Sequence, residues 1–383
     1  MKFLKKSISE EWKNLKKFES LSDFERSIVF YAENEASMNH FRTLITELTG
    51  KMNQQICYIT SVKNDPIFLS TNNNIISFYI GEGTVRTKFF LTLKAKILLM
   101  DMPDLNTYHI KRSKVYPVHY IYLFHSIFSI HSYLRKGALD NYDTIFCVGP
   151  HHVNEIKSTE KFYGLKSKKL VEYGFGRLDT LLQEKENFIK KNPNLKNLVL
   201  ITPSYGKENL LQKYGIELID LLLESNFMVL LRPHFRTLND SNKLINSIIE
   251  KFSNNSKFIF EDGVIPSEYF QNSICMISDW PGISFEYAFT FERPAVFIDV
   301  PKKILNPDSN DISLTPIEIS FRNKLGYVVS PDELKIIPKL INDIDQRDKF
   351  SEQIQKIRSD TIINICGSAK IGATFIQQLI KSN

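Results

Sequence analysis

Short runs of apolar residues recur along the first half of the chain, with polar turns and stretches of helical spacing between them. The runs are continuous and do not alternate with polar residues, which is typical of parallel strands that are buried on both faces. The intervals between the runs are long enough for helical crossovers. We therefore predict strands over residues 27–32, 55–60, 75–80, 95–100, 120–124 and 144–148, with a helix over 39–48 after the first strand.

A second series of the same kind begins at Asn197. It predicts strands over 198–202, 227–231, 257–260, 274–277 and 295–298, and helices over 208–224, 240–252 and 283–291. The pattern then loosens into a loop over 301–316, and helices over 331–359 and 367–382 close the chain. Strands that alternate with helices in this way predict α/β domains with parallel sheets.

With 383 residues the chain is long enough for two such domains in series. A charged helical stretch that is interrupted by Pro193 separates the two series, so we expect a linker over 181–196. The N-terminal domain would then cover 20–180 and the C-terminal domain 197–383, including the closing helices. Two Rossmann-like domains in series predict a bilobal protein that binds its ligand in the cleft between them.

Residues 1–19 have the spacing of an amphipathic helix. Leu4, Ile8, Trp12 and Leu15 fall on one face, and the stretch carries six lysines against three glutamates. A basic helix with an apolar stripe can lie on anionic lipid headgroups. It can equally pack the stripe on its own domain and leave the lysines in solvent, and the sequence leaves both interpretations open.

The composition is that of a globular protein, with a net charge of +6 at pH 7. Dense basic runs are lacking, so an anionic ligand or membrane surface fits the charge better than nucleic acid does. Three of the four cysteines (Cys57, Cys147 and Cys275) lie in predicted strands, which indicates buried free thiols in a reducing compartment. No apolar stretch reaches the ~20 residues that span a bilayer, and no signal peptide opens the chain, so we expect a cytoplasmic protein.

The segment 278–286 joins a predicted strand to a predicted helix. The first N–H groups of a helix have no intrahelical partner, and the helix dipole favours an anion there. We expect Ser278 or Asp279 to cap the helix and Gly282 to let a phosphate approach the backbone. Ser284 adds a hydroxyl, and Glu286 is placed about one turn into the helix, where it could hold a ribose. An ordinary strand–helix turn would have the same features.

Two further segments follow strands of the second series. Arg232, His234 and Arg236 come after the strand over 227–231, and guanidinium and imidazole groups at a strand end suit phosphate oxygens. Ser204 follows the strand over 198–202 and can add a third loop to the same edge of a parallel sheet. No Walker A spacing, metal-ligand set or cofactor motif occurs, so we expect no metal and no cofactor.

Histidines mark the strand ends of the first series. His125 follows the strand over 120–124, where α/β sheets place ligands, and a histidine there can act as a general base for a hydroxyl. His131 is a second candidate for this role, and either ring could instead line the cleft or the core. His151 and His152 are adjacent, so their side chains diverge, and we assign them to structure or cleft lining. Phosphate-binding turns on one domain and a histidine-bearing edge on the other predict group transfer from a nucleotide-activated donor.

Taken together, these motifs resemble the CDP-glycerol glycerophosphotransferase family, which includes teichoic acid primases and polymerases and related capsule enzymes. The resemblance runs from about residue 28 to residue 299. It is carried by Phe30-Tyr31-Ala32-Glu33, Asn39-His40-Phe41, His125, residues 174–179, Arg232-Pro233-His234 and residues 278–286.

The resemblance implies a GT-B fold, with the acceptor on the first lobe and the donor nucleotide on the second. It implies that His125 activates the acceptor hydroxyl and that His234 contacts the donor pyrophosphate together with Ser278, Gly282 and Ser284. Attack at the β-phosphorus would transfer glycerol phosphate from CDP-glycerol to a glycan or lipid-linked acceptor and release CMP. The resemblance also implies association with the cytoplasmic face of the membrane, which favours the lipid-binding interpretation of residues 1–19.

The chain departs from the family pattern at three motifs. His125-Ser126 replaces a His-Gly pair, Phe235 replaces the proline after Arg232-Pro233-His234, and 174–177 reads Gly-Phe-Gly-Arg in place of Gly-Tyr-Pro-Arg. These departures suggest a divergent branch that serves capsule or another surface glycan and leave a CDP-ribitol donor open. The segment 278–286 is also similar to the nucleotide loop of GT-B glycosyltransferases and UDP-N-acetylglucosamine 2-epimerases, so an enzyme acting on a nucleotide sugar is the alternative. A catalytically silent scaffold at the membrane is a third hypothesis.

Overall fold

The computed structural model describes residues 2–187, 192, 195–263, 265–280, 282–302, 305–343 and 348–382. Residues of the expected linker over 181–196 and of the expected helix over 331–359 therefore lie partly outside the described residues. The described residues form two compact units. Unit 1 comprises 1–180, 306–314 and 361–383, and unit 2 comprises 181–305 and 315–360.

Unit 1 is built on a seven-stranded parallel sheet with the strand order β3-β2-β1-β4-β5-β6-β7. The strands are β1 (Ile28–Ala32), β2 (Ile56–Thr60), β3 (Ile75–Tyr79), β4 (Ile97–Met100), β5 (His119–Leu123), β6 (Thr144–Cys147) and β7 (Lys169–Glu172). The main helices are α1 (Lys2–Ser20), α2 (Ser37–Thr46), α3 (Thr84–Thr92), α5 (Pro150–Tyr163) and α16 (Ser368–Ser382), with α4 (Ile130–Tyr133) as a single turn. The interior strands β1 and β2 are buried at every position, as their continuous apolar sequences predict.

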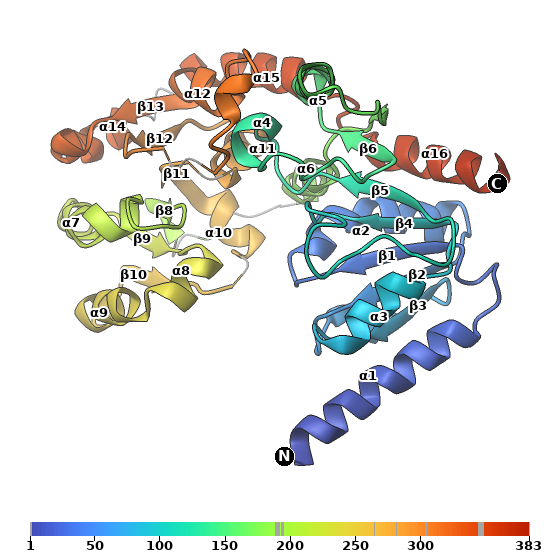
Figure 1. Ribbon diagram of the computed structural model, residues 1–383. Helices are drawn as coiled ribbons and strands as arrows, with labels where there is room; N and C mark the ends of the chain where they lie inside the picture. The colour runs from blue at the N-terminus through green and yellow to red at the C-terminus, as the bar shows by residue number, and fades with distance from the viewer. Residues whose placement is uncertain are drawn as a thin grey trace. The chain divides into compact units, whose positions relative to one another are not determined.

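Unit 2 is built on a six-stranded parallel sheet with the strand order β10-β9-β8-β11-β12-β13. The strands are β8 (Leu198–Thr202), β9 (Met228–Leu231), β10 (Phe258–Phe260), β11 (Ser273–Ser278), β12 (Ala295–Ile298) and β13 (Gly326–Val329). The larger helices are α7 (Leu210–Glu224), α9 (Asn242–Phe252), α11 (Ile283–Phe291), α14 (Ile337–Asp343) and α15 (Asp348–Thr361) (Figure 1). Shorter helices are α8 (Phe235–Asp240), α10 (Ser267–Asn272), α12 (Ile317–Ser320) and α13 (Arg322–Leu325), and α6 (Gly176–Asn187) connects the units along the chain.

The predicted strands are confirmed to within about two residues, and the sheets are parallel as expected. The edge strand β13 was not predicted, because its four residues stand in a polar stretch without a flanking helical pattern. The strand needs its glycine: a Cβ on Gly326 would lie 1.8 Å from the carbonyl oxygen of Ala295 on β12. Only a residue without a side chain lets β13 approach this closely.

The last helix lies in unit 1, whereas its position in the chain had suggested the second domain, expected over 197–383. Ala373 and Ile376 of α16 are fully buried in the core of unit 1. Gly372 is so close to the rings of Tyr173 and Phe146 that an added Cβ would lie 2.7 and 3.0 Å from them. The expected boundary is therefore corrected for this helix, because side-chain packing across the chain decides its place.

The described part of α1 packs on unit 1. Leu15 and Phe18 are 1% and 2% exposed, and the Phe18 ring contacts those of Phe78 and Phe89 at 6.0 and 5.3 Å. The prediction that the apolar stripe of α1 faces lipid is therefore wrong for the described half of the helix, because Leu15 and Phe18 are covered by protein. The side chains of Leu4 and Ile8 lie outside the described residues.

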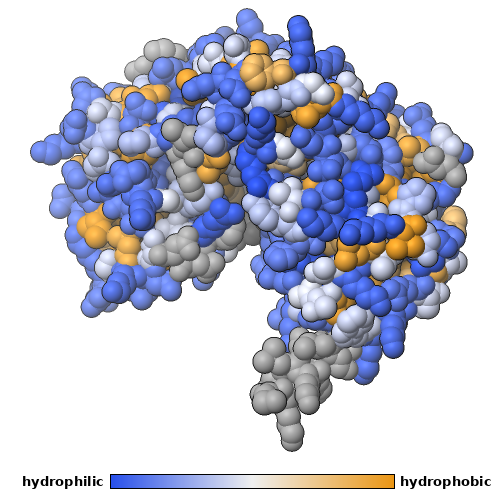
Figure 2. All heavy atoms as spheres, in the orientation of Figure 1, coloured by the Kyte–Doolittle hydropathy of each residue, from blue (hydrophilic) through white to orange (hydrophobic). Residues whose placement is uncertain are grey.

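On the face of the protein that Figure 2 shows, hydrophilic residues predominate. Among the described helices, none has the length and apolar character needed to cross a membrane.

Candidate active site

His125 lies two residues beyond β5, at the carboxyl edge of the sheet of unit 1. Its Nδ1 is 3.0 Å from the carbonyl oxygen of Asp101, which follows β4, and 3.3 Å from the Tyr122 hydroxyl. A carbonyl oxygen can only accept, so this contact assigns the proton to Nδ1 and leaves the lone pair of the neutral ring on Nε2. Burial lowers the pKa of His125, which favours that neutral ring. A neutral ring that is held through Nδ1 in this way can act as a general base through Nε2.

Two neighbours of His125 were not singled out as site residues from the sequence. The ring of His40, on α2, has its centroid 6.2 Å from that of His125, and its buried Nδ1 has no hydrogen-bond partner among the described residues. Burial, and then the neighbouring His125 and Arg177, keep the pKa of His40 well below its ordinary value. The Asp101 carboxyl is buried and accepts a hydrogen bond from Ser37 Oγ at 3.0 Å. Its sequence position gave no signal, because it holds His125 through a backbone oxygen.

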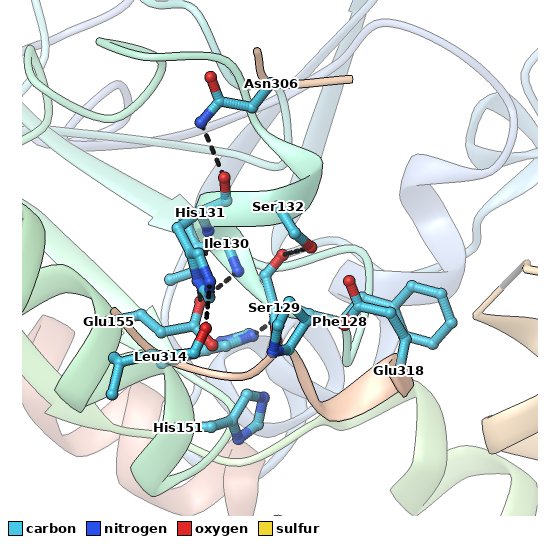
Figure 3. Close-up of polar contacts among 12 residues, drawn as sticks. Phe128, Ser129, Ile130, His131, Ser132, His151, Glu155, Asn306, Leu314 and Glu318 are labelled. Atoms are coloured by element: carbon cyan, nitrogen blue, oxygen red, sulfur yellow. Dashed lines mark hydrogen bonds and ion pairs between the residues drawn. The ribbon is translucent and has the colours of Figure 1, made fainter. Parts of the chain in front are cut away.

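His131 occupies the interior of unit 1 and is 5% exposed (Figure 3). Its Nε2 is 2.9 Å from the Leu314 carbonyl oxygen, and its Nδ1 is 3.0 Å from Glu155 Oε2. Its own carbonyl oxygen accepts a hydrogen bond from Asn306 Nδ2 at 2.7 Å. The catalytic role expected for His131 is therefore corrected: both ring nitrogens face protein acceptors, so neither is available to a substrate hydroxyl. His131 thus forms hydrogen bonds with both ends of the segment 306–314, at Asn306 and at Leu314.

The adjacent histidines at the start of α5 are structural, as predicted. Nε2 of His151 is 2.7 Å from the Ile127 carbonyl oxygen, and Nε2 of His152 is 2.9 Å from that of Phe128. His152 also accepts a hydrogen bond from the Val148 N–H through Nδ1. The two rings hold the segment that leads from His125 into α4.

In unit 2, the segments after β8, β9 and β11 lie at one edge of the sheet, because these strands are parallel neighbours. Ser204 follows β8, residues 232–236 follow β9, and residues 279–286 follow β11. This confirms that the sequence-predicted phosphate-binding segments share one rim. Burial lowers the pKa of Arg232, and the negative charge of Glu286 acts in the opposite direction.

His234 caps the start of α8 with its ring. Its Nδ1 accepts a hydrogen bond from the Arg236 N–H at 3.2 Å, which leaves the proton of the neutral ring on Nε2. The protonation pattern is the reverse of that at His125. His234 can therefore donate a hydrogen bond to a phosphate oxygen, while His125 can accept a proton.

Asp279 and Ser278 are interior residues. The Asp279 carboxylate is 1% exposed and accepts from Ser204 N and Oγ, at 2.6 and 2.9 Å, and from Leu210 N at 3.0 Å. Ser278 is fully buried, and its Oγ donates to the Thr202 carbonyl oxygen at 2.6 Å. The cap expected from these residues is wrong for α11, because both side chains turn toward the end of β8 and the loop after it. Ser278 and Asp279, which were predicted to contact a donor, instead hold the loop after β8 in place.

The start of α11 is formed by backbone. Gly282 is the residue before the helix, and no side chain caps it. Ser284 is 1% exposed, so its side chain belongs to the interior, whereas Glu286 is half-buried. The positive end of the dipole of this nine-residue helix therefore lies at the rim, where it favours an anion.

Comparison with known proteins identifies a family and a fold. The profile of the family described as CDP-Glycerol:Poly(glycerophosphate) glycerophosphotransferase matches residues 17–302. The structure is similar to that of the wall teichoic acid polymerase TagF, with a TM-score of 0.60 and 15% identity over 98% of this chain and 95% of that chain.

It is also similar to the UDP-GlcNAc 2-epimerase of Methanocaldococcus jannaschii, with a TM-score of 0.54 and 16% identity over 92% of this chain and 99% of that chain. At these identities the likeness shows the fold, which is of the GT-B type. None of the curated sequences compared with the chain matches it.

Proposed function

The chain belongs to the CDP-glycerol:poly(glycerophosphate) glycerophosphotransferase family, and from this premise we propose that it transfers glycerol phosphate from CDP-glycerol, or a related polyol phosphate from a CDP-polyol, to a hydroxyl of a cell-surface glycan or teichoic-acid-like acceptor. In this reaction the acceptor oxygen attacks the β-phosphorus and the bond from that phosphorus to the CMP oxygen breaks. CMP leaves with the bonding electrons. The hydroxyl proton passes to a base of the enzyme.

We assign the base to His125. The single observation that carries this assignment is the contact between its Nδ1 and the Asp101 carbonyl oxygen at the end of the sheet. That contact fixes the ring through Nδ1 and leaves the basic lone pair on Nε2. The lowered pKa of His125 keeps the base unprotonated at neutral pH.

The donor phosphates are assigned to the rim of unit 2. His234 donates through Nε2, Arg232 and Arg236 supply positive charge, and the dipole at the start of α11, after Gly282, favours a phosphate oxygen. These groups would stabilise the charge that develops as CMP departs. Glu286 is assigned to the donor ribose. Ser204, Ser278, Asp279 and Ser284 support these groups from within the rim.

We place the reaction at the cytoplasmic face of the membrane, where a lipid-linked or capsule acceptor would be met. The exposed lysines of α1 (Lys13, Lys16 and Lys17) support this location, since a basic surface is attracted to anionic headgroups. The membrane contact is electrostatic in this proposal, because the apolar side of the described half of α1 packs on unit 1.

Incubation with CDP-glycerol and a glycerol-phosphate-primed acceptor, with CMP release as the readout, tests the proposal. We expect turnover by the native protein and a loss of roughly 10²-fold or more in both His125→Ala and His234→Ala, as removal of a general base or a charge-stabilising donor does. Full activity of both variants would place the chemistry elsewhere. No CMP release with any CDP-polyol would remove the proposed reaction.

A thermal-shift series with CDP, CMP and UDP separates the proposal from its alternatives. A ligand at 100 times its Kd stabilises the folded state by about 2.7 kcal/mol. Stabilisation by the cytidine nucleotides supports the CDP-activated donor. Stabilisation by UDP alone would indicate an enzyme acting on a nucleotide sugar, and no stabilisation by any nucleotide would favour a silent scaffold.

A further inference from the structure

Tyr205 lies on the rim of unit 2 between two of its proposed donor-binding side chains. Its ring centroid is 4.7 Å from that of His234, with an interplanar angle of 32°. The guanidinium carbon of Arg236 lies 4.8 Å from the centroid of the same ring, and Arg236 Nη1 donates a hydrogen bond to the Tyr205 hydroxyl at 3.0 Å. One aromatic side chain therefore contacts both the His234 imidazole and the Arg236 guanidinium.

Hydrogen bonds of the preceding residue, Ser204, hold the backbone at Tyr205 in place. Its neighbour Ser204 is bonded through both N and Oγ to the buried Asp279, and the Ser204 carbonyl oxygen accepts from Asn209 Nδ2 at 2.7 Å. On the other side, Gly206 has φ +116°, a conformation that side chains rarely adopt, and it turns the loop toward α7. Tyr205 thus projects from an anchored turn and not from a free loop.

We propose that Tyr205 is the positioning residue of the donor site, which holds His234 and Arg236 in the arrangement that binds the donor's diphosphate. The inference rests on the proposed function and deepens it. Aromatic–imidazole and cation–π contacts restrict the two side chains before the ligand arrives, so less freedom is lost on binding. The inference also accounts for the burial of Asp279, whose carboxylate anchors the turn that carries Tyr205.

The test is a double-mutant cycle on CDP affinity, measured by calorimetry. Tyr205→Leu removes both ring contacts and should weaken CDP binding about tenfold or more. Tyr205→Phe keeps the ring and loses only the hydrogen bond to Arg236, so it should restore most of the affinity, within about threefold of the native protein. Tyr214→Leu, at a half-buried tyrosine on α7, is the matched control and should bind CDP normally.

Arg236→Ala completes the cycle. If Tyr205 acts through Arg236, the loss caused by Tyr205→Leu should shrink in the Arg236→Ala background, whereas a general loosening of the loop would give additive losses. In turnover assays, the KM for the donor should rise in Tyr205→Leu while the KM for the acceptor stays unchanged. A rise in both would indicate a loss of structure.

The outcomes separate this inference from the proposed function. If the native protein binds CDP and Tyr205→Leu binds it equally well, or if the cycle is additive, Tyr205 has no positioning role and the proposed function stands. If the native protein binds inorganic pyrophosphate but no cytidine nucleotide, and Tyr205→Leu weakens that binding, the positioning role holds and the proposed donor is wrong. If neither ligand binds, both are overturned.

Discussion

At the residue scale, the imidazoles of His125 in unit 1 and His234 in unit 2 carry their protons on opposite nitrogens. His125 donates through Nδ1 to the Asp101 carbonyl oxygen, and His234 accepts at Nδ1 from the Arg236 N–H. One ring is thereby prepared to take a proton and the other to give a hydrogen bond. The sequence places His125 and His234 at strand ends but does not show this difference, because their partners are backbone groups.

The pH dependence of the reaction follows from the environment of His125. Burial holds its pKa below the ordinary value of 6.5, and the base must be neutral to act. We expect kcat/KM to be flat near neutral pH and to fall only as the pH drops through a value below 6.5. The measurement is a kcat/KM profile from pH 5 to 8 with saturating acceptor, and an acid limb at or above 6.5 would contradict the assignment.

Asp101 should make the stability of the fold depend on pH. Burial raises the pKa of its carboxyl to about 7, from an ordinary value of 3.8, so the folded state keeps a proton that the unfolded state releases. The free energy of unfolding should therefore fall as pH rises from about 4 to about 7, by up to about 4 kcal/mol from this group. Asp101→Asn removes the titration and should flatten that slope.

Urea unfolding of the native protein and of Asp101→Asn between pH 4.5 and 7.5 checks this expectation. Asp140→Asn, at an exposed carboxylate of the same unit, is the control and should keep the native slope. Equal slopes for the native protein and Asp101→Asn would mean that the carboxyl is ionised throughout.

The residue types at strand ends were enough to predict which segments form the rim of unit 2, but they did not predict the role of each side chain. Ser278 and Asp279 have the chemistry of helix caps, yet they are bonded to the end of β8 and the loop after it. His131 has the chemistry of a base, yet Glu155 and the Leu314 carbonyl oxygen occupy both its nitrogens. Such competition between local and long-range partners depends on the fold and cannot be read from spacing.

At the element scale, the strands were predictable because burial on both faces demands continuous apolar runs, as in β1 and β2. Elements whose place depends on distant partners were not. The edge strand β13 exists only because Gly326 fits against β12, and α1 turns its apolar side to Phe78 and Phe89 of its own unit.

We predict that the outer face of α1 binds anionic membranes through its exposed lysines. Lys13, Lys16 and Lys17 are exposed, and each lysine near an anionic surface contributes about 1 kcal/mol. Replacing all three by glutamine should lower the affinity for phosphatidylserine vesicles roughly 10²-fold and leave folding intact, as measured by vesicle sedimentation.

The control for this triple variant changes three exposed lysines of unit 2, Lys243, Lys335 and Lys339, to glutamine, which gives the same net charge. Equal losses in the two variants would mean that overall charge, and not α1, governs attraction to the vesicles. High salt should weaken the native binding, since the proposed contact is electrostatic.

At the scale of the whole molecule, the chain passes between the units after residues 180, 305, 314 and 360. Unit 1 is therefore completed by two segments that come late in the sequence, 306–314 and 361–383. Neither unit is a contiguous stretch, which explains why a boundary drawn along the chain assigned α16 to the second domain.

The two tryptophans offer a direct test of this assignment, since Trp12 lies in unit 1 and Trp280 in unit 2. In Trp280→Phe the fluorescence of Trp12 reports the unfolding of unit 1, and in Trp12→Phe the fluorescence of Trp280 reports the unfolding of unit 2.

Gly372→Val forces a side chain into the rings of Tyr173 and Phe146, and overpacking of this kind costs about 1–3 kcal/mol. We expect the urea midpoint reported by Trp12 to fall and the one reported by Trp280 to stay. Ile371→Val, at the exposed neighbouring position, is the control. A fall only in the urea midpoint reported by Trp280 would mean that the last helix packs in unit 2, because the substitution would then destabilise the core of that unit.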